Sequence, residues 1–203
     1  LTTGQYKGFS ITAALEDVRA VAGIDDYSVP PAGFKPGEYS VIADPETTEL
    51  HQGYLQYQTE GLTLKAGRQI IALDGHRFVG HVGWRQDWQT FDALSAGYKR
   101  GQFSAYYAYV TQRNRIFAEA ADMDSKDHLL NASYASDFGK FTAYAYLLET
   151  DNDIDNSLNT FGISYSGKYT ADTLTWLYAA EFATQTNDTA RKLLMKSPCS
   201  PIP

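Results

Sequence analysis

The sequence predicts an all-β protein, an antiparallel up-and-down meander of about nine strands. Apolar residues recur at every second position, and the connections between these alternating segments are alternately long and short. No run approaches the roughly 18 to 20 apolar residues that a membrane helix needs. Because successive side chains of a strand point to opposite faces, each segment has one apolar and one mostly polar or small face. We expect strands at 8–19, 50–58, 62–70, 88–98, 102–113, 127–136, 141–149, 158–166 and 173–183.

The first three strands already show both faces. Polar side chains interleave with apolar ones, which is the pattern of a half-buried strand. In 50–58 the polar positions are Gln52, Tyr54 and Gln56. The apolar positions are Phe9, Ile11, Ala13 and Leu15 in the first strand, and Leu62, Leu64 and Ala66 in the third.

The middle strands continue the pattern, with one ambiguity. In 88–98, Asp92 and Leu94 share a parity, so the faces of this strand stay open. The two following strands alternate clearly. Their apolar positions are Phe103, Ala105, Tyr107 and Tyr109, then Leu130, Ala132 and Tyr134.

The last three strands complete the meander with the same period of two. The apolar residues of each are aligned on one face, opposite Thr, Ser and Gly. The apolar positions are Phe141, Ala143, Ala145 and Leu147, then Phe161, Ile163 and Tyr165, then Leu174, Trp176, Tyr178, Ala180 and Phe182.

The connection lengths distinguish a membrane barrel from a soluble one. Outer-membrane barrels have tight turns at one end and long loops at the other. A soluble sandwich or lipocalin-like barrel would explain the alternation but has no need to segregate loop lengths. The long connections are 20–49, 71–87, 114–126 and 150–157, and the short ones are 59–61, 99–101, 137–140 and 167–172.

Charge and aromatic residues support the same orientation. The net charge is -7 and no cluster of Lys and Arg occurs, so a nucleic-acid partner is not expected. Acidic residues gather in the long connections and basic ones at the short turns. Aromatic residues at the short-turn end are placed as an interfacial girdle. They are Tyr57, Tyr98, Phe103, Tyr134, Phe138, Phe141, Tyr165 and Tyr169.

Enzymatic and metal chemistry have weak support in the sequence. Cys199 is the only cysteine, which excludes a disulfide framework and a cysteine-built zinc site. His76 and His81 are five residues apart on an irregular loop, a spacing that fixes no coordination geometry. We expect no catalytic residue, no metal and no cofactor. An outer-membrane barrel hydrolase is a lesser alternative, since no His lies beside a Ser in the strand alternation. It stays open because a catalytic triad is recognised by its geometry, which the sequence does not supply.

One segment resembles a known family. The stretch KAGRQIIALDGHRFVGHVGWRQDWQTFDAL, which ends at Leu94, is similar to the alginate-export family of bacterial outer-membrane β-barrels. Its most specific parts are GRQ at 67–69 and the run from Arg85 to Ala93, and the resemblance covers about residues 4–185. It implies a monomeric pore in outer-membrane lipid that passes anionic polysaccharide such as alginate, or small anionic solutes, by diffusion. The alternative is a soluble or surface sugar-binding β-sheet protein.

The expected strand number indicates a partial barrel. Single-chain bacterial barrels have an even number of strands, and nine is odd. We therefore expect residues 1–185 to form part of a barrel and the proline-containing stretch 186–203 to lie outside it as a tail that is not native barrel sequence.

The connection around 68–85 is the candidate constriction. Arg68, Arg77 and Arg85, with two histidines, outnumber the single Asp74, and rings of Arg select anions. Arg68 shares a parity with Leu64, so it reaches the lumen only if the strand has ended or a bulge at Gly67 switches faces. A solvated loop or salt bridges between loops are the alternative. Further expected pore-lining residues are Lys65 and Asp92, and expected sugar contacts are Gln52, Tyr54, Gln56 and Tyr144.

Overall fold

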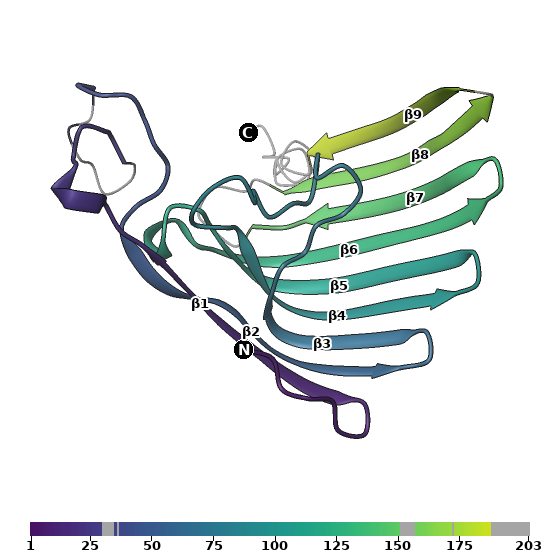
Figure 1. Cartoon of the computed structure of the whole chain (residues 1–203), viewed down its shortest axis with the longest axis horizontal. Helices are drawn as coiled ribbons and strands as arrows, with labels where there is room; N and C mark the ends of the chain where they lie inside the picture. The colour runs from purple at the N-terminus through teal and green to yellow at the C-terminus, as the bar shows by residue number, and fades with distance from the viewer. Residues whose placement is uncertain (30–34, 36, 151–156, 172, 188–203) are drawn as a thin grey trace, which may run out of the picture.

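The computed structural model describes residues 1–29, 35, 37–150, 157–171 and 173–187. These residues form one antiparallel sheet in which every strand pairs with its neighbours in sequence, from β1 to β9 (Figure 1). The predicted all-β meander of nine strands is thereby confirmed. The strands are β1 (Phe9–Val18), β2 (Thr47–Thr59), β3 (Leu62–Gln69), β4 (Thr90–Arg100), β5 (Phe103–Asn114), β6 (Met123–Ser136), β7 (Gly139–Leu148), β8 (Leu158–Ala171) and β9 (Leu174–Asn187).

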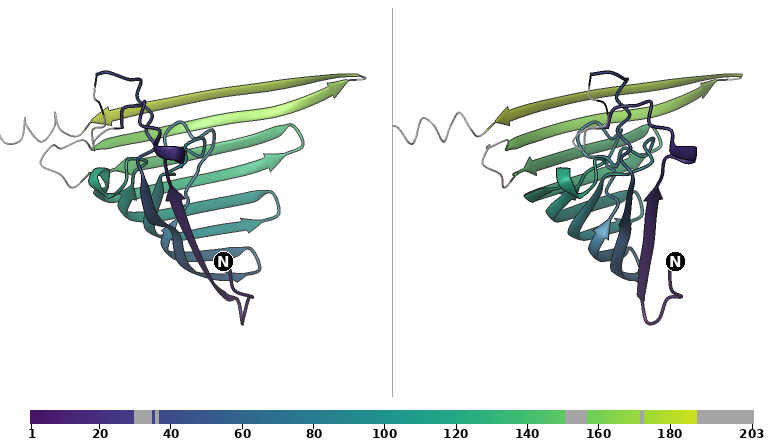
Figure 2. Two further views of the ribbon diagram at one scale, coloured as in Figure 1. Left: turned by 60° about the vertical axis from the view of Figure 1, so that its left-hand side comes forward. Right: turned by 90° about the vertical axis from the view of Figure 1, so that its left-hand side faces the viewer.

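The sheet is curved and open (Figure 2). Within the described residues, β1 pairs only with β2 and β9 only with β8, so the sheet is not closed into a barrel. Two single-turn 3-10 helices, η1 (Val21–Gly23) and η2 (Glu119–Ala121), are the helical elements of the described chain. None of its helices is long and apolar enough to cross a membrane.

The turn between β2 and β3 places a glycine where another residue would not fit. Gly61, between β2 and β3, has a φ of +73°, and a Cβ built on it would lie 2.4 Å from the carbonyl oxygen of Lys99. Glycine therefore allows β3 to turn beside the end of β4.

Several strands are longer than the alternation predicted, among them β2, which begins at Thr47 rather than at 50. β6 begins at Met123 rather than at 127, and β8 continues to Ala171 rather than 166. The added part of β8 pairs with β9 up to the pair Ala171 and Leu174. Backbone pairing thus extends the hairpin through residues whose side chains no longer alternate. β9 also passes the expected barrel end at 185, while 188–203 of the expected tail lie outside the described residues.

The outer face carries a row of aromatic side chains near the short turns. The strand register joins Phe103 to Tyr134, Tyr134 to Phe141 and Phe141 to Tyr165. The rings of Phe141 and Tyr165 stack with centroids 4.4 Å apart. Because cross-strand partners lie on one face, the predicted clustering at this end is present as a continuous row over β5 to β8.

The opposite face, here called the inner face, holds the core. Its buried apolar side chains come from the nine-stranded sheet, here called the wall, and from the connection 70–89, which folds onto this sheet (Figures 1 and 2). The sheet therefore buries its core against its own long connection and leaves apolar side chains exposed on the outer face. The core residues are Ile71, Val79, Phe91, Ala93, Ala108, Val110, Leu129, Tyr144 and Tyr146.

Candidate functional site

The connection 70–89 is structured by its own backbone. The amide of Leu73 donates to the carbonyl of Val79 at 3.1 Å, and the amide of Gln89 donates to the carbonyl of His81 at 2.9 Å. The side chain of Gln89 also donates to the carbonyl of Gly80 at 2.9 Å. These bonds satisfy polar backbone groups that would otherwise be costly to bury beside the core. The connection is therefore a defined element of the inner face.

Apolar contacts hold the middle of this connection against β7. Ile71 and Val79 belong to the buried core, and Phe78 packs against it. The ring of Phe78 lies 5.8 Å from that of Tyr144 and 6.4 Å from that of Tyr146. The two tyrosine rings stack on each other at 4.9 Å. Tyr144, an expected sugar contact, is only 5% exposed because these rings surround it.

Asp74 forms a polar anchor across β6 and β7. Its Oδ2 atom accepts hydrogen bonds from Asn131 Nδ2 and from the Tyr146 hydroxyl, each at 2.8 Å. Asn131 Nδ2 also donates to the Tyr146 hydroxyl oxygen at 3.0 Å. Hydrogen bonds to a charged acceptor are stronger than neutral ones. The tip of the connection is therefore fixed by one carboxylate.

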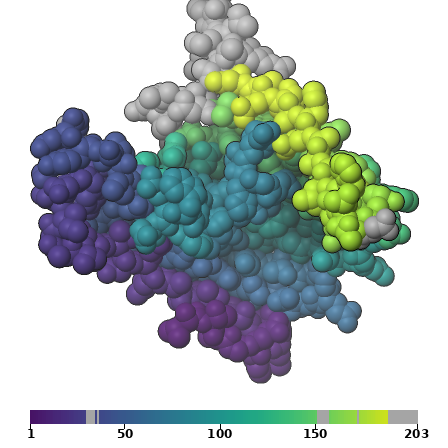
Figure 3. All heavy atoms as spheres, turned by 45° about the horizontal axis from the view of Figure 1, so that its top comes forward, coloured from purple at the N-terminus to yellow at the C-terminus, as the bar shows by residue number. Residues whose placement is uncertain are grey.

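Arg77 extends the contact to the last strand. Its Nη1 atom lies 3.0 Å from Glu181 Oε2, and Glu181 Oε1 accepts a hydrogen bond from the Tyr144 hydroxyl at 2.7 Å. In the space-filling view, the blue-teal atoms of this part of the chain adjoin the yellow atoms of β9 (Figure 3). The Arg77 side chain remains 69% exposed. It is thus the predicted constriction arginine that presents most of its surface to solvent.

Arg85 joins the same connection to the long β1–β2 connection. Its Nη1 atom lies 3.3 Å from Asp44 Oδ2, and the backbone amide of Gln86 donates to Asp44 Oδ1 at 3.0 Å. The guanidinium also lies 4.3 Å from the ring centre of Trp84. Arg85 therefore links the connection 70–89 to the β1–β2 connection through its ion pair with Asp44.

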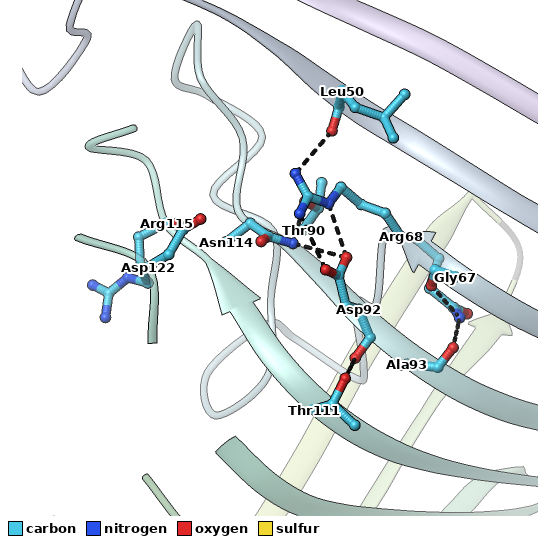
Figure 4. Close-up of polar contacts among 11 residues, drawn as sticks. Leu50, Gly67, Arg68, Thr90, Asp92, Ala93, Thr111, Asn114, Arg115 and Asp122 are labelled. Carbon is cyan, nitrogen blue, oxygen red and sulfur yellow. Dashed lines mark hydrogen bonds and ion pairs between the residues drawn. The ribbon is translucent and has the colours of Figure 1, made fainter. Parts of the chain in front are cut away.

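Arg68 pairs with Asp92 at the loop end of β3 and β4 (Figure 4). Two bonds of 2.8 and 3.1 Å make the pair bidentate, and Arg68 Nη1 donates to the Leu50 carbonyl at 3.3 Å. Asn114 Nδ2 donates to the same carboxylate at 3.2 Å. The sequence placed Arg68 and Asp92 near a constriction without pairing them.

The parity question at Gly67 is answered by the strand register. Gly67 has a φ of +120°, yet pairing continues without a shift from Ala66 opposite Leu94 to Arg68 opposite Asp92. Arg68 therefore keeps the parity of the outward side chains Ala66 and Leu94, one residue before β3 ends. Its bidentate partner shares that parity, so the charge is neutralised locally.

The remaining expected pore-lining groups lie on the inner-face parity, in register with the core strands. Lys65 pairs with Ser95 on one side and Gln56 on the other, and its Nζ lies 4.6 Å from the centre of the Tyr54 ring. Gln52 and Tyr54 share this parity through the register of β1 and β2. These groups lie on strands beside the folded-in connection, and the described contacts do not join them to Arg77.

Several residues that matter here were missed by the sequence reasoning. Glu181 binds a partner 104 positions away. Asp127 is 1% exposed and binds Arg113 through two bonds of 2.6 and 2.7 Å. Asp87 is buried near the β5–β6 connection. An acidic residue at an inward position of a strand was a usable signal for Asp127 and Glu181, whereas Asp87 had none.

Two half-buried groups outside the strands, Asp122 and His81, have pKa values that their surroundings shift. Burial raises the pKa of Asp122, against the effect of the Arg115 backbone amide that donates to it at 2.7 Å. Burial also lowers the pKa of His81, helped by the nearby imidazole of His76. The His76 and His81 rings lie 5.1 Å apart. Within the described residues no three His, Cys, Asp or Glu side chains gather as metal ligands.

An up-and-down antiparallel sheet with an exposed apolar and aromatic outer face and long connections at one end has the features of an outer-membrane β-barrel wall. The fold therefore defines a protein of the outer-membrane β-barrel transport class. The chain belongs to the alginate-export family: the family model described as alginate export matches residues 12–192. This is a family of outer-membrane transport proteins for polysaccharide. No curated protein and no solved structure matches the chain.

Proposed function

We propose that the chain forms part of a passive channel of the bacterial outer membrane for anionic polysaccharide such as alginate, or for small anionic solutes. The connection 70–89 is its constriction. The observation that carries the proposal is that two residues of this connection bind the inner face of the sheet. Asp74 binds Asn131 on β6 and Tyr146 on β7, and Arg77 binds Glu181 on β9. A folded-in connection narrows a barrel without closing it, and its charges then act at short range on a passing solute.

Arg77 is the main selecting group in this proposal. Arg68 and Arg85 have side chains that are 21% and 20% exposed, whereas that of Arg77 is 69% exposed. A guanidinium can bind a carboxylate through two parallel hydrogen bonds, which suits the acidic sugars of such a polymer. Lys65, Tyr54 and the neighbouring glutamines offer charge, a ring and amides to the same polymer on the wall.

The open edges of the sheet need partners in this proposal. Backbone groups at β1 and β9 cannot be left unpaired in lipid. We therefore propose that strands outside the described residues close the barrel and that the closed barrel is a monomer.

The test uses the full-length outer-membrane protein that carries this chain, reconstituted in planar bilayers under a salt gradient. The wild type is expected to pass anions in preference to cations. Replacing Arg68, Arg77 and Arg85 together by Gln is expected to reduce that preference. Arg100→Gln, at the short-turn end of β4, is the matched control and should leave it unchanged. Cation preference in the wild type, or no change in the triple variant, would contradict the assignment.

A further inference from the structure

Asp87 is a buried carboxyl group where two long connections meet. It lies near the end of the connection 70–89 and is 4% exposed. Its Oδ2 atom accepts a hydrogen bond from the backbone amide of Ala118, in the β5–β6 connection, at 3.3 Å. Among the described residues no Lys, Arg or His forms an ion pair with it. A buried carboxylate without a cation is costly, because burial removes the water that stabilises its charge.

The groups that face Asp87 from neighbouring elements make its ionisation still less favourable. Glu49 on β2, Glu16 on β1 and Asp122 before β6 all act on it as like charges. These carboxylates come from three elements, so the connection 70–89 brings a fourth acid among them. If all four carboxyl groups were ionised, their negative charges would repel one another where these elements meet.

The nearby cationic and titratable groups do not pair with Asp87. Arg115, in the β5–β6 connection, donates from Nη1 to the Met123 sulfur at 3.3 Å. Arg68, which lies near Glu49 and Asp122, is bound to Asp92, and Arg85 is bound to Asp44. His51 Nδ1 lies 2.7 Å from Glu16 Oε2. His81 packs its ring 4.9 Å from the ring of Trp88, the residue after Asp87. None of these groups offers Asp87 a counter-charge.

The direction of the pH effect follows from these contacts. Burial, the carboxylate of Glu49 and then that of Glu16 raise the pKa of Asp87 to about 7, although the Ala118 amide acts in the opposite direction. A carboxyl whose pKa is raised by the folded arrangement stabilises that arrangement in its protonated form. The stabilisation is complete at pH values below the ordinary aspartate pKa of about 4 and is lost as the pH rises through about 7.

We propose that Asp87 is a pH-sensitive latch of the constriction. When protonated, it carries no charge, and the end of the connection 70–89 stays packed against the β5–β6 connection. When ionised, it is repelled by Glu16, Glu49 and Asp122, and this end of the connection is released. The latch rests on the proposed function, since it regulates the opening that the connection narrows. Asp74 and Arg77 keep the tip attached, so the release is local.

The test measures single-channel conductance of the full-length protein in planar bilayers from about pH 5.5 to about pH 8.5. The wild type is expected to show low conductance at acidic pH and a rise with a midpoint near 7. Asp87→Asn removes the titration and should give the low conductance throughout. Glu49→Gln keeps the latch but removes one like charge, so its midpoint should fall to a lower pH. This second variant keeps the test decisive if Asp87→Asn does not fold.

Asp137→Asn, in the exposed turn between β6 and β7, is the matched control and should keep the wild-type midpoint. A flat wild-type profile, a pH step that survives in Asp87→Asn, or an unshifted midpoint in Glu49→Gln overturns the latch. The anion preference, measured separately at one fixed pH, distinguishes the two proposals. A channel that prefers anions but lacks the pH step contradicts the latch alone, and a pH step without anion preference contradicts the proposed selectivity alone.

Discussion

Arg77 and Glu181 are joined at 3.0 Å although 104 positions separate them in the sequence. This ion pair ties the tip of the folded-in connection to the last described strand. Glu181 also receives the hydroxyl of Tyr144 at 2.7 Å, so one carboxylate holds two side chains of the inner face. The positive charge of Arg77 is therefore partly compensated by the carboxylate of Glu181 on β9. Under the proposed function, we expect Glu181 to influence the ion selectivity.

Glu181→Gln is expected to increase the anion preference of the channel. The amide keeps an oxygen for the Tyr144 hydroxyl but no longer compensates the charge of Arg77. The reversal potential under a salt gradient measures the change. Glu60→Gln, in the exposed β2–β3 turn, is the control and should leave the reversal potential unaltered. A shift toward cations in Glu181→Gln would show that Arg77 does not act on the passing ions.

Single replacements of the three arginines should rank by exposure. Arg77→Gln is expected to lower the anion preference most, because its side chain is 69% exposed while those of Arg68 and Arg85 are near 20%. Arg68→Gln and Arg85→Gln should instead act mainly on stability, since each leaves a carboxylate without its partner. Reversal potentials and urea unfolding of the reconstituted protein, measured on the same three variants, give the two rankings. Equal selectivity losses in all three would contradict this order.

Asp127→Asn should be strongly destabilising. Asp127 is 1% exposed and holds Arg113 by two hydrogen bonds, so the substitution leaves a largely buried guanidinium without its counter-charge. Removal of one partner from a buried pair costs about 3 to 5 kcal/mol of the free energy of unfolding. Unfolding in urea from lipid vesicles measures the loss. Asp17→Asn breaks the exposed pair with Arg19 and should cause no measurable change.

Tyr146→Phe tests the Asp74 anchor without altering charge. It removes the hydroxyl that donates to Asp74 at 2.8 Å and keeps the ring that packs under Phe78. We expect a loss of about 1.5 to 3 kcal/mol in unfolding free energy, the range for a hydrogen bond to a charged group. Amide hydrogen exchange in 70–89 should rise as the tip loosens. In Tyr134→Phe, whose hydroxyl bonds Gln102 on the outer face, exchange in this connection should stay unchanged.

The fold was largely predictable because strand alternation and loop polarity are local signals. Each face of β5 or β7 can be read from its own residues, and the row from Phe103 to Tyr165 follows once the strands are placed in register. The ends of β6 and β8 were not predictable in the same way. Their added residues are held by pairing with a neighbour, which the side-chain pattern of one strand does not report.

The candidate site was predictable only in its location. The basic residues of 68–85 marked a connection that the structure packs onto the inner face, where Arg77 pairs with Glu181 and Arg85 with Asp44; their role at a constriction stays a prediction. The partners of these arginines come from elsewhere in the sequence, and no local pattern distinguishes Asp44 from a solvated acid. Asp87 was missed for the same reason, since its surroundings exist only after four elements have come together.

The long reach of the connection 70–89 sets the order in which the molecule can be assembled. Its anchors are Asn131 on β6, Tyr146 on β7 and Glu181 on β9, all of which follow it in the chain. Contacts of such large sequence separation must wait for the intervening strands to pair, because closing the long loop earlier costs entropy without any compensating contact. The contacts of Asp74 can therefore form only after β6 and β7 have paired, and the ion pair of Arg77 with Glu181 only after β9 has joined the sheet.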